Sequence, residues 1–346
     1  MSPHTSRGTL ALGLAFSVCL TAVLGCGEDA QAPTGPAVTP EAAAEAAADL
    51  AINSNTWLKR ADMPGARRAF AVASLQNASG QSVVYVIGGI GPDGAPLSRV
   101  QAYNVATNTW STKASTISAL FYPNGAAVIG GKIYVTGGTR DFYNEFNALI
   151  VYDPAKNTWV HKRSMPGGGY QGVSGVIDNK LYVAFGCLTG PCAFRRYDPA
   201  TDLWTILPAP TEQHVGGVAG VIGNKLYVTG GRLDFQGAEK LEVYDPATNA
   251  WTTKAPMPVG TGLSAAAVVG GRLHVIGGYV SNPDGSARES RSHFVYDPAL
   301  DRWLTRTSLP AGAGAIGGAA KVFVNGQPRI EMVSSTPSGN NWQYTP

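Results

Sequence analysis

Short runs of β-branched, aromatic and aliphatic residues alternate along most of the chain with turn residues, chiefly Gly, Asn and Asp-Pro. One unit begins at Ala126 and holds two such runs joined by a glycine doublet at residues 130–131. A third run ends at Asp153-Pro154, and a fourth begins just before Trp159. Runs of this length and composition, bounded by turn residues, predict β-strands. Each unit is therefore expected to form a sheet of four strands.

The unit repeats at near-constant intervals along the chain. Six tryptophans mark it, with spacings of 53, 49, 45, 47 and 52 residues: Trp57, Trp110, Trp159, Trp204, Trp251 and Trp303. A period of this size with strands inside it is typical of a repeat architecture. One four-stranded sheet cannot shelter the large face of its tryptophan, whereas stacked neighbouring sheets can, so we expect the sheets to form a ring.

The two ends of the chain complement each other. Residues 341–346 align with residues 293–298, so the last unit stops before an outer strand, and Trp342 is not a seventh member of the tryptophan series. Residues 55–60 match residues 108–113 and supply that strand. The sequence therefore predicts an all-β fold, a six-bladed β-propeller closed by the N-terminal strand.

The recurring marks resemble those of the kelch family of β-propellers. They are the Gly-Gly doublet, a Tyr at a fixed distance after it, and a Trp shortly after that Tyr. The resemblance covers residues 55–346 and implies a kelch-type propeller, similar to bacterial exported kelch-repeat lipoproteins and distantly to sialic acid mutarotases. Two units depart from the pattern, because residues 185–187 and 332–334 stand where a glycine pair is expected.

The N-terminal region is expected to carry signals for export. Residues 1–25 place Arg7 before an apolar stretch too short to span a bilayer, as in a signal peptide. Cys26 ends a Val-Leu-Gly-Cys sequence that resembles a lipoprotein box, with lipidation at this cysteine; an ordinary cleaved signal is the alternative. Residues 26–52 are rich in Ala and Pro and predict a disordered tether before a propeller at residues 53–346. We expect a lipid anchor in the bacterial cell envelope, with the outer membrane preferred.

Cysteine and charge usage fit that compartment. Cys187 and Cys192 flank a four-residue turn, which favours a hairpin disulfide in an oxidising space over a metal site. Charged residues make up 14% of the chain and the net charge is +3, which gives no reason to expect a nucleic-acid partner. Basic residues do follow most of the tryptophans, and we interpret them as charges that protect the outer edge strands from pairing. They are Lys59, Arg60, Lys113, Lys162, Arg163, Lys254 and Arg306.

One face of the ring is expected to carry any binding site. The turns from the first to the second run are short and uniform, whereas residues 90–98, 139–147, 232–239 and 279–291 form longer loops that differ between units. Variable loops on a rigid scaffold commonly carry binding. Aligning the Met-Pro or Leu-Pro signals before each inner strand places aromatic and basic residues at that mouth, where they suit a sugar, a carboxylate or a peptide. The binding candidates are Arg67, Arg68, Tyr122, Arg140, Asp141, Phe142, Tyr143, Tyr170, His214, Arg232, Asp234 and Phe235.

The leading hypothesis is a non-catalytic, surface-tethered propeller that binds a protein or glycan partner through its long-loop face, as a monomer. The alternative is a sugar mutarotase acting on a sialic-acid-like substrate at the channel mouth. Its weak acid–base candidates are Glu212, Glu239 and His214. The sequence shows no phosphate-binding loop, haem motif or metal-ligand cluster, so we expect neither a cofactor nor a metal.

Overall fold

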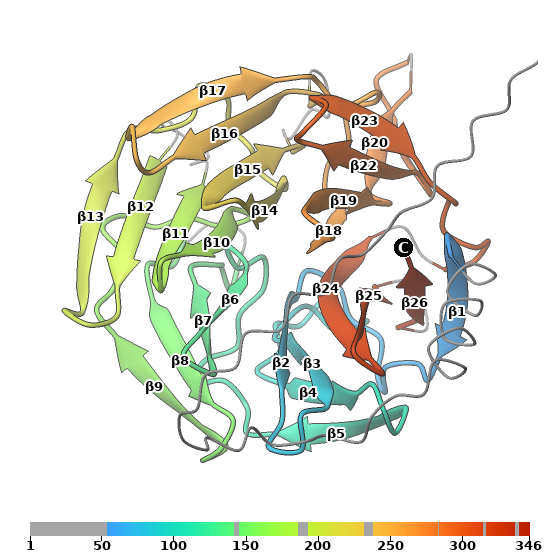
Figure 1. Cartoon of the computed structure of the whole chain (residues 1–346). Helices are drawn as coiled ribbons and strands as arrows, with labels where there is room; N and C mark the ends of the chain where they lie inside the picture. Colours follow the sequence, from blue (N-terminus) through green and yellow to red (C-terminus); the bar gives the residue numbers. More distant parts are fainter. Residues whose placement is uncertain are drawn as a thin grey trace, which may run out of the picture. The chain divides into compact units, whose positions relative to one another are not determined.

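A computed structural model describes the chain in seven stretches: residues 54–141, 145–185, 193–231, 238–282, 284–313, 316–335 and 339–346. The regular elements within these residues are strands, and they form six four-stranded antiparallel sheets arranged as blades around a central channel (Figure 1). The predicted six-bladed, all-β propeller is confirmed. The predicted signal peptide, lipidation site, tether and Cys187–Cys192 disulfide lie outside the described residues.

The first three blades follow one another along the chain, each running from the channel outwards. Blade 1 consists of β2 (Ala71–Gln76), β3 (Ser82–Ile87), β4 (Val100–Asn104) and β5 (Thr109–Lys113). Blade 2 consists of β6 (Ala126–Ile129), β7 (Lys132–Thr136), β8 (Leu149–Asp153) and β9 (Thr158–Lys162). Blade 3 consists of β10 (Val173–Ile177), β11 (Lys180–Phe185), β12 (Ala193–Asp198) and β13 (Leu203–Leu207).

The last three blades repeat this order with two additions, a hairpin and a closing strand. Blade 4 consists of β14 (Val218–Ile222), β15 (Lys225–Thr229), β16 (Leu241–Asp245) and β17 (Ala250–Lys254). Blade 5 consists of β18 (Ala265–Val269), β19 (Arg272–Ile276), β22 (His293–Asp297) and β23 (Arg302–Thr305), with a hairpin of β20 (Tyr279–Ser281) and β21 (Ala287–Glu289) inserted before β22. Blade 6 consists of β24 (Gly317–Val324), β25 (Gln327–Ser334), β26 (Asn341–Thr345) and β1 (Thr56–Arg60).

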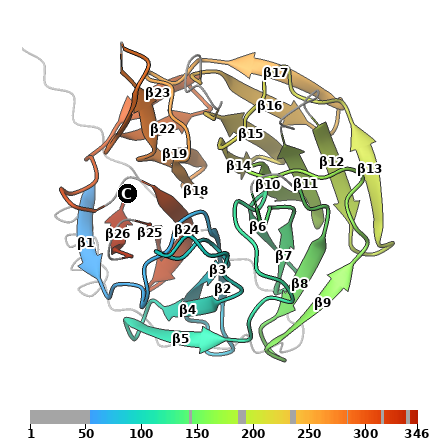
Figure 2. The ribbon, with the colours of Figure 1, turned by 180° about the vertical axis from the view of Figure 1, so that it is seen from behind.

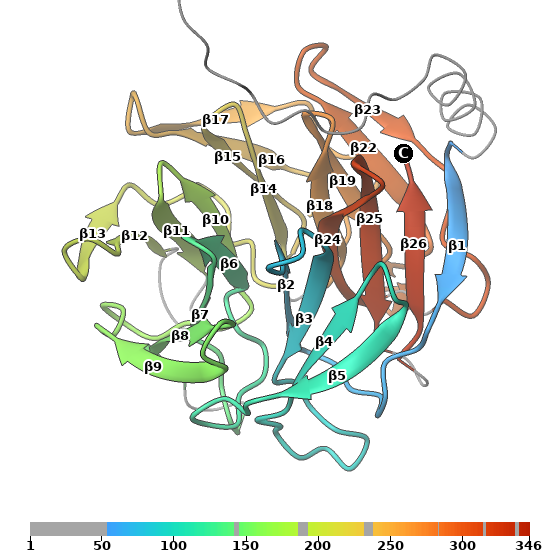
Figure 3. The same ribbon diagram turned by 60° about the horizontal axis from the view of Figure 1, so that its bottom comes forward.

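The N-terminal strand β1 is the outer strand of the last blade. It pairs antiparallel with β26 from Thr56 opposite Thr345 to Arg60 opposite Asn341. The two strands lie side by side at one side of the ring (Figure 3). The predicted closure is therefore confirmed. Without β1, the backbone groups on the outer edge of β26 would lack a strand partner, which is the condition that sheet proteins avoid.

Each tryptophan of the repeat links two blades. Its indole Nε1 donates a hydrogen bond to a backbone carbonyl just after the outer strand of the preceding blade, at 2.8 to 3.0 Å. Trp57 closes the circle, because it donates to Thr307, at the end of blade 5. The ring is thus held by the same indole contact at every junction, as well as by the buried face of each indole.

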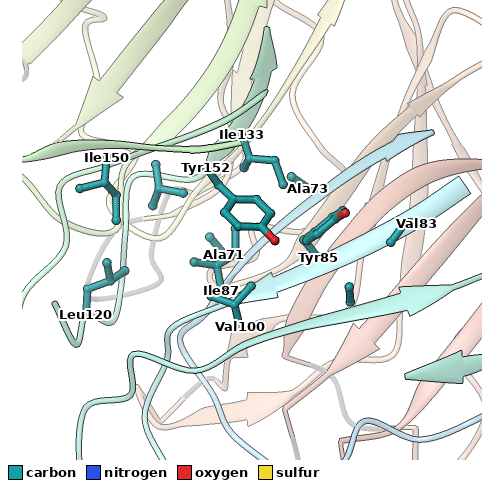
Figure 4. Close-up of a cluster of buried hydrophobic side chains, with 12 residues drawn as sticks. Ala71, Ala73, Val83, Tyr85, Ile87, Val100, Leu120, Ile133, Ile150 and Tyr152 are labelled. Carbon is teal, nitrogen blue, oxygen red and sulfur yellow. The ribbon is translucent and has the colours of Figure 1, made fainter. Parts of the chain in front are cut away.

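Buried apolar side chains fill the space between neighbouring blades. Between blades 1 and 2, the rings of Tyr85 and Tyr152 lie 5.7 Å apart and pack among Ala71, Ile133 and Ile150 (Figure 4). Burying a side chain of this size stabilises a fold by about 1.5–3 kcal/mol. Each sheet packs one face against each neighbouring blade, so the core is divided into clusters at the blade junctions. The channel-facing edge of each blade lies outside these clusters and can contribute side chains to a site.

Candidate functional site

A chain of backbone hydrogen bonds surrounds one end of the channel. Just before its inner strand, each of blades 1 to 5 holds one residue with positive φ: Ala69 (58°), Tyr122 (50°), Gln171 (51°), Gly216 (74°) and Leu263 (55°). Four of these residues donate their N–H to the carbonyl of the one before, at 2.7 to 2.9 Å. A left-handed backbone costs a residue with a Cβ about 1–2 kcal/mol. These bonds hold that conformation and join five blades at the channel mouth.

The mouth opens into a cavity of about 390 Å³ that all six blades line. Arg68, Tyr122, Gln171 and Tyr279 bring the larger polar side chains, while Ser174, Ser264 and a set of Gly, Ala and Val residues line the rest. Among the described residues, no Asp or Glu lines the cavity. Arg68 is exposed, and the described residues offer its guanidinium no salt bridge. The mouth therefore presents one uncompensated positive charge beside tyrosine hydroxyls.

Both tyrosine hydroxyls of this cavity are neutral near pH 7, and burial moves their pKa values further from that pH. Burial raises the pKa of Tyr122, and the charge of Arg68 and a hydrogen bond with Gln171 only partly offset that rise. Burial also raises the pKa of Tyr279, with smaller contributions from Glu289 and Tyr122 and an opposing one from Arg68. A neutral phenol both donates and accepts hydrogen bonds. Together with Arg68, the site has the groups to bind a ligand that is both hydroxylated and anionic.

Of the predicted mouth residues, Arg68 and Tyr122 line the cavity, while Arg67 and Tyr170 are buried behind it. Arg67 donates to the carbonyl of Arg99 at 2.9 Å and to Gln101 Oε1 at 2.8 Å. Burial, then the charge of Arg99, lowers its pKa to about 10. Its guanidinium serves blade 1 and is not available to a ligand. Tyr170 packs with its ring centroid 6.5 Å from that of Tyr122.

His214 is also buried, and it occupies the place in blade 4 that Arg67 has in blade 1. Its Nδ1 faces the carbonyl of Gly230 at 2.8 Å, and its Nε2 lies 3.2 Å from Glu242 Oε2. Glu242 also accepts hydrogen bonds from the amides of Thr211 and Glu212. Burial alone would raise the pKa of Glu242, but the bonds from His214, Thr211 and Glu212 lower it to about 2. This cluster anchors the segment before β14, and His214 does not line the cavity.

The remaining candidates lie on the loops around the mouth. Arg140 and Asp141 are exposed after β7, and the Arg140 guanidinium lies 4.6 Å from the ring centroid of Phe146. Glu212 lies 3.6 Å from Lys240 Nζ, and the carbonyl of Glu239 accepts from Met257. Neither glutamate lines the cavity. Five predicted residues fall outside the described part of the chain: Phe142, Tyr143, Arg232, Asp234 and Phe235.

Three residues of this region were not predicted from the sequence: Gln171, Tyr279 and Glu242. Tyr279 directly follows a glycine doublet, and a backbone bridge pairs it with Gly262 beside the mouth. Ile90 and Thr139, which follow the doublets of blades 1 and 2, make the same kind of bridge. In blades 1, 2 and 5, the residue after the doublet that ends the second strand therefore pairs with the segment before the inner strand, and in blade 5 this residue lines the cavity. Among the described residues, no three His, Cys, Asp or Glu side chains are grouped as a metal site, and no helix is long and apolar enough to cross a membrane.

Comparison with known proteins agrees with the repeat. The Kelch motif is recognised at residues 67–116, 121–166 and 214–258, which correspond to blades 1, 2 and 4. The chain is a kelch-repeat protein. It is 38% identical to Kelch-like protein terF of Aspergillus terreus over 113 residues, which are 30% of the chain and 24% of that protein. It is 35% identical to an F-box/kelch-repeat protein of Arabidopsis thaliana over 109 residues, 30% of the chain and 27% of that protein.

These relatives match the kelch-repeat protein over about a quarter of their own length. A solved structure titled "Structure of YjhT" superposes with a TM-score of 0.66 at 17% identity, covering 81% of the chain and 94% of that structure. At this identity the likeness shows the fold alone. Function has to be argued from the kelch-repeat protein's own cavity and loops.

Proposed function

We propose that this kelch-repeat protein is a non-catalytic binding module that holds a protein or glycan partner through its long-loop face. The observation that carries the proposal is Arg68, which is exposed at a cavity that no carboxylate of the described residues lines, beside two neutral tyrosines. A guanidinium pairs well with carboxylate, and phenol hydroxyls pair with hydroxyl or amide groups. An acidic sugar or an acidic side chain of a protein partner matches this set of groups.

The chemistry of the cavity supports binding over catalysis. A general acid–base reaction on a sugar is most efficient with a group whose pKa lies near the working pH, within hydrogen-bond reach of the substrate, and the raised pKa values of Tyr122 and Tyr279 lie far above that range. Of the three weak acid–base candidates, His214 is bonded on both ring nitrogens, and Glu212 and Glu239 do not line the cavity. One observation favours the alternative mutarotase, namely a cavity of about 390 Å³, which is within the range of small-molecule sites.

The test is a binding screen of the chain against acidic and neutral glycans and acidic peptides, at two salt concentrations. We expect acidic ligands to bind, more weakly at high salt, and Arg68→Ala to weaken them by about tenfold or more, as expected for a charge-assisted pair. Arg302→Ala is the matched control, since it removes an exposed arginine on the outer strand of blade 5, away from the cavity. Equal loss in both variants, or none in either, would rule out this site. Anomer interconversion by the wild type, followed by NMR, would favour the mutarotase.

We also propose that the protein is exported and tethered to the cell envelope through a lipid on Cys26. The support is the Val-Leu-Gly-Cys sequence after a short apolar stretch, followed by an Ala/Pro-rich segment. Metabolic labelling with a fatty acid should label the wild type but not Cys26→Ser. Labelling that persists in that variant contradicts the anchor.

A further inference from the structure

The outer strand of blade 3 differs from the other five outer strands. Three residues after the repeat tryptophan, the other blades carry a basic residue: Arg60, Lys113, Lys162, Lys254 and Arg306. Blade 3 has Leu207 at this position and Ile206 just before it. Charged side chains on an edge strand discourage pairing with a foreign strand. Strand β13 lacks this protection.

The edge of β13 is open and apolar. In its sheet the order is β10-β11-β12-β13, so β13 pairs with β12 on one side and with no described strand on the other. It lies on the outer rim of the ring (Figure 2). Leu203 is 49% exposed and Ile206 is 67% exposed, the highest exposure among the large apolar side chains of the described residues. The strand therefore offers unpaired backbone groups together with apolar side chains.

The charges next to this edge are positive. Arg195 is paired with Ile206 across the β12–β13 register, and Arg196 is paired with Thr205, so one arginine flanks the edge on each face of the sheet. Arg196 also donates to Thr205 Oγ1 at 3.3 Å. The nearby acids already have partners, because Asp198 pairs with Lys180 at 2.7 Å and Asp202 accepts from the Tyr197 hydroxyl at 2.6 Å. A strand docked here is expected to carry acidic side chains.

We propose that β13 is a second docking edge, which takes up an extended segment of a partner protein in which apolar and acidic residues alternate. Backbone hydrogen bonds to the open edge of β13 hold the segment, as in other cases of strand addition. On one face of the extended sheet its apolar side chains contact Ile206, and on the other face its acidic side chains lie beside Leu203 and reach Arg196. This surface lies on the rim, away from the channel mouth. A second copy is a poor occupant, because β13 paired with itself brings four arginines together.

The test measures binding of a labelled eight-residue peptide of alternating valine and glutamate to the full chain by fluorescence polarisation. A valine–lysine peptide serves as the charge-reversed probe. We expect the glutamate peptide to bind with an affinity that falls as salt rises, the lysine peptide not to bind, and β13 amides to gain protection from hydrogen exchange. Ile206→Thr, which places in blade 3 the residue type found at Thr253 and Thr305, should weaken binding by about fivefold or more through lost apolar contact.

Ile206→Glu provides a charge swap at the same position. It should lose the glutamate peptide and acquire binding of the lysine peptide, because a shift of the peptide by one residue places its lysines on the face of the new carboxylate. That binding also shows that the variant is folded. Val160→Glu is the matched control, a half-exposed apolar residue on the outer strand of blade 2, and should leave both results unchanged. Binding that is indifferent to Ile206→Glu overturns the proposal, as does absence of glutamate-peptide binding to the wild type. A concentration-dependent dimer that Ile206→Glu dissolves would also overturn it, in favour of pairing between copies.

Discussion

The hydroxyl of Tyr344 donates a hydrogen bond to Asn55 Oδ1 at 2.8 Å, joining residues that are 289 positions apart. The same tyrosine-to-Asn/Asp bond recurs in every other blade, at 2.6 to 2.7 Å: Tyr103–Asn108, Tyr152–Asn157, Tyr197–Asp202, Tyr244–Asn249 and Tyr296–Asp301. The closing blade therefore reproduces, from the two ends of the chain, a contact that the other blades make locally. The contact also reaches the preceding blade, blade 5, because the backbone N–H of Thr307 donates to the same oxygen of Asn55.

Asn55 is predicted to stabilise the ring more than its counterpart Asn249. Asn55 accepts two hydrogen bonds, whereas Asn249 accepts one from Tyr244, since the facing residue of the preceding blade is Pro208, which has no N–H. Both asparagines have positive φ, so glycine fits either position without strain. Asn55→Gly should lower the free energy of unfolding by about 1–3 kcal/mol, and Asn249→Gly by roughly 1 kcal/mol less. Urea unfolding measures both; equal losses would contradict the two-bond interpretation.

The stability of the ring is predicted to fall as pH falls below about 6.5, because of a buried histidine pair. His274 Nδ1 lies 3.0 Å from His293 Nε2, and both rings are buried. Burial, with the charge of Arg306 and then Arg272, lowers the pKa of His274 to about 4. Burial and then His274 lower the pKa of His293 to about 3. A histidine with a lowered folded pKa is protonated first in the unfolded chain, so stability is lost as pH drops from the unfolded value towards the folded one.

The histidine pair should contribute a loss on the order of 3 kcal/mol between pH 7 and pH 4. Because Glu331 acts in the opposite direction over this range, the loss is measured as the difference in the free energy of unfolding between the wild type and a variant without the two histidines. The double variant His274→Tyr/His293→Leu carries the residues of the equivalent positions Tyr134 and Leu149 in blade 2, and should flatten the acid side of the curve. An unchanged pH profile in this variant would show that other groups cause the loss.

Glu331 is predicted to lower the free energy of unfolding as pH rises. It is fully buried in β25, at the position that Tyr134 occupies in blade 2, and its Oε1 has no hydrogen-bond partner among the described residues. Its Oε2 accepts from Gln343 at 3.0 Å. Burial raises its pKa to about 7, against smaller opposing effects of Gln343, Arg60 and Asn341. An acid whose folded pKa is raised holds its proton more tightly in the fold, so stability falls as pH rises from about 4.5 to 7.

Glu331→Gln should remove this dependence, because the amide is neutral at every pH and retains an oxygen for Gln343. We expect the variant to be more stable than the wild type at pH 8, by about 2–3 kcal/mol, and little different at pH 4.5. Thermal unfolding at the two pH values measures the difference. A variant that is less stable than the wild type at pH 8 would contradict the prediction that the buried, ionised carboxylate of Glu331 destabilises the fold.

Much of the fold was predictable because its determinants are local and repeated. The tryptophan period, the glycine doublets and the Asp-Pro turns each set a strand end within a few residues; the tryptophan recurs in all six blades, and the other two signals in four. In the Asp-Pro turns, for example, Asp153 Oδ1 accepts from the N–H of Ala155, two residues on. The candidate site was predicted less completely. The spacing from the Met-Pro or Leu-Pro signal to the inner strand varies between blades, so the alignment makes Tyr170 the equivalent of Tyr122. In the structure the equivalent of Tyr122 in blade 3 is Gln171, whose N–H donates to the carbonyl of Tyr122.

From the sequence alone, the blade number, the strand order and the closure by residues 55–60 were determined, since periodicity and turn chemistry act over a few residues. Only the tertiary structure decided which polar side chains face the channel. Two neighbouring arginines before Ala69 illustrate this: the side chain of Arg68 lines the cavity mouth, whereas that of Arg67 is buried in blade 1. Likewise, the burial of Glu242, His274, His293 and Glu331 depends on which blade lies against them. Such environments arise from packing between distant segments, which local patterns do not encode.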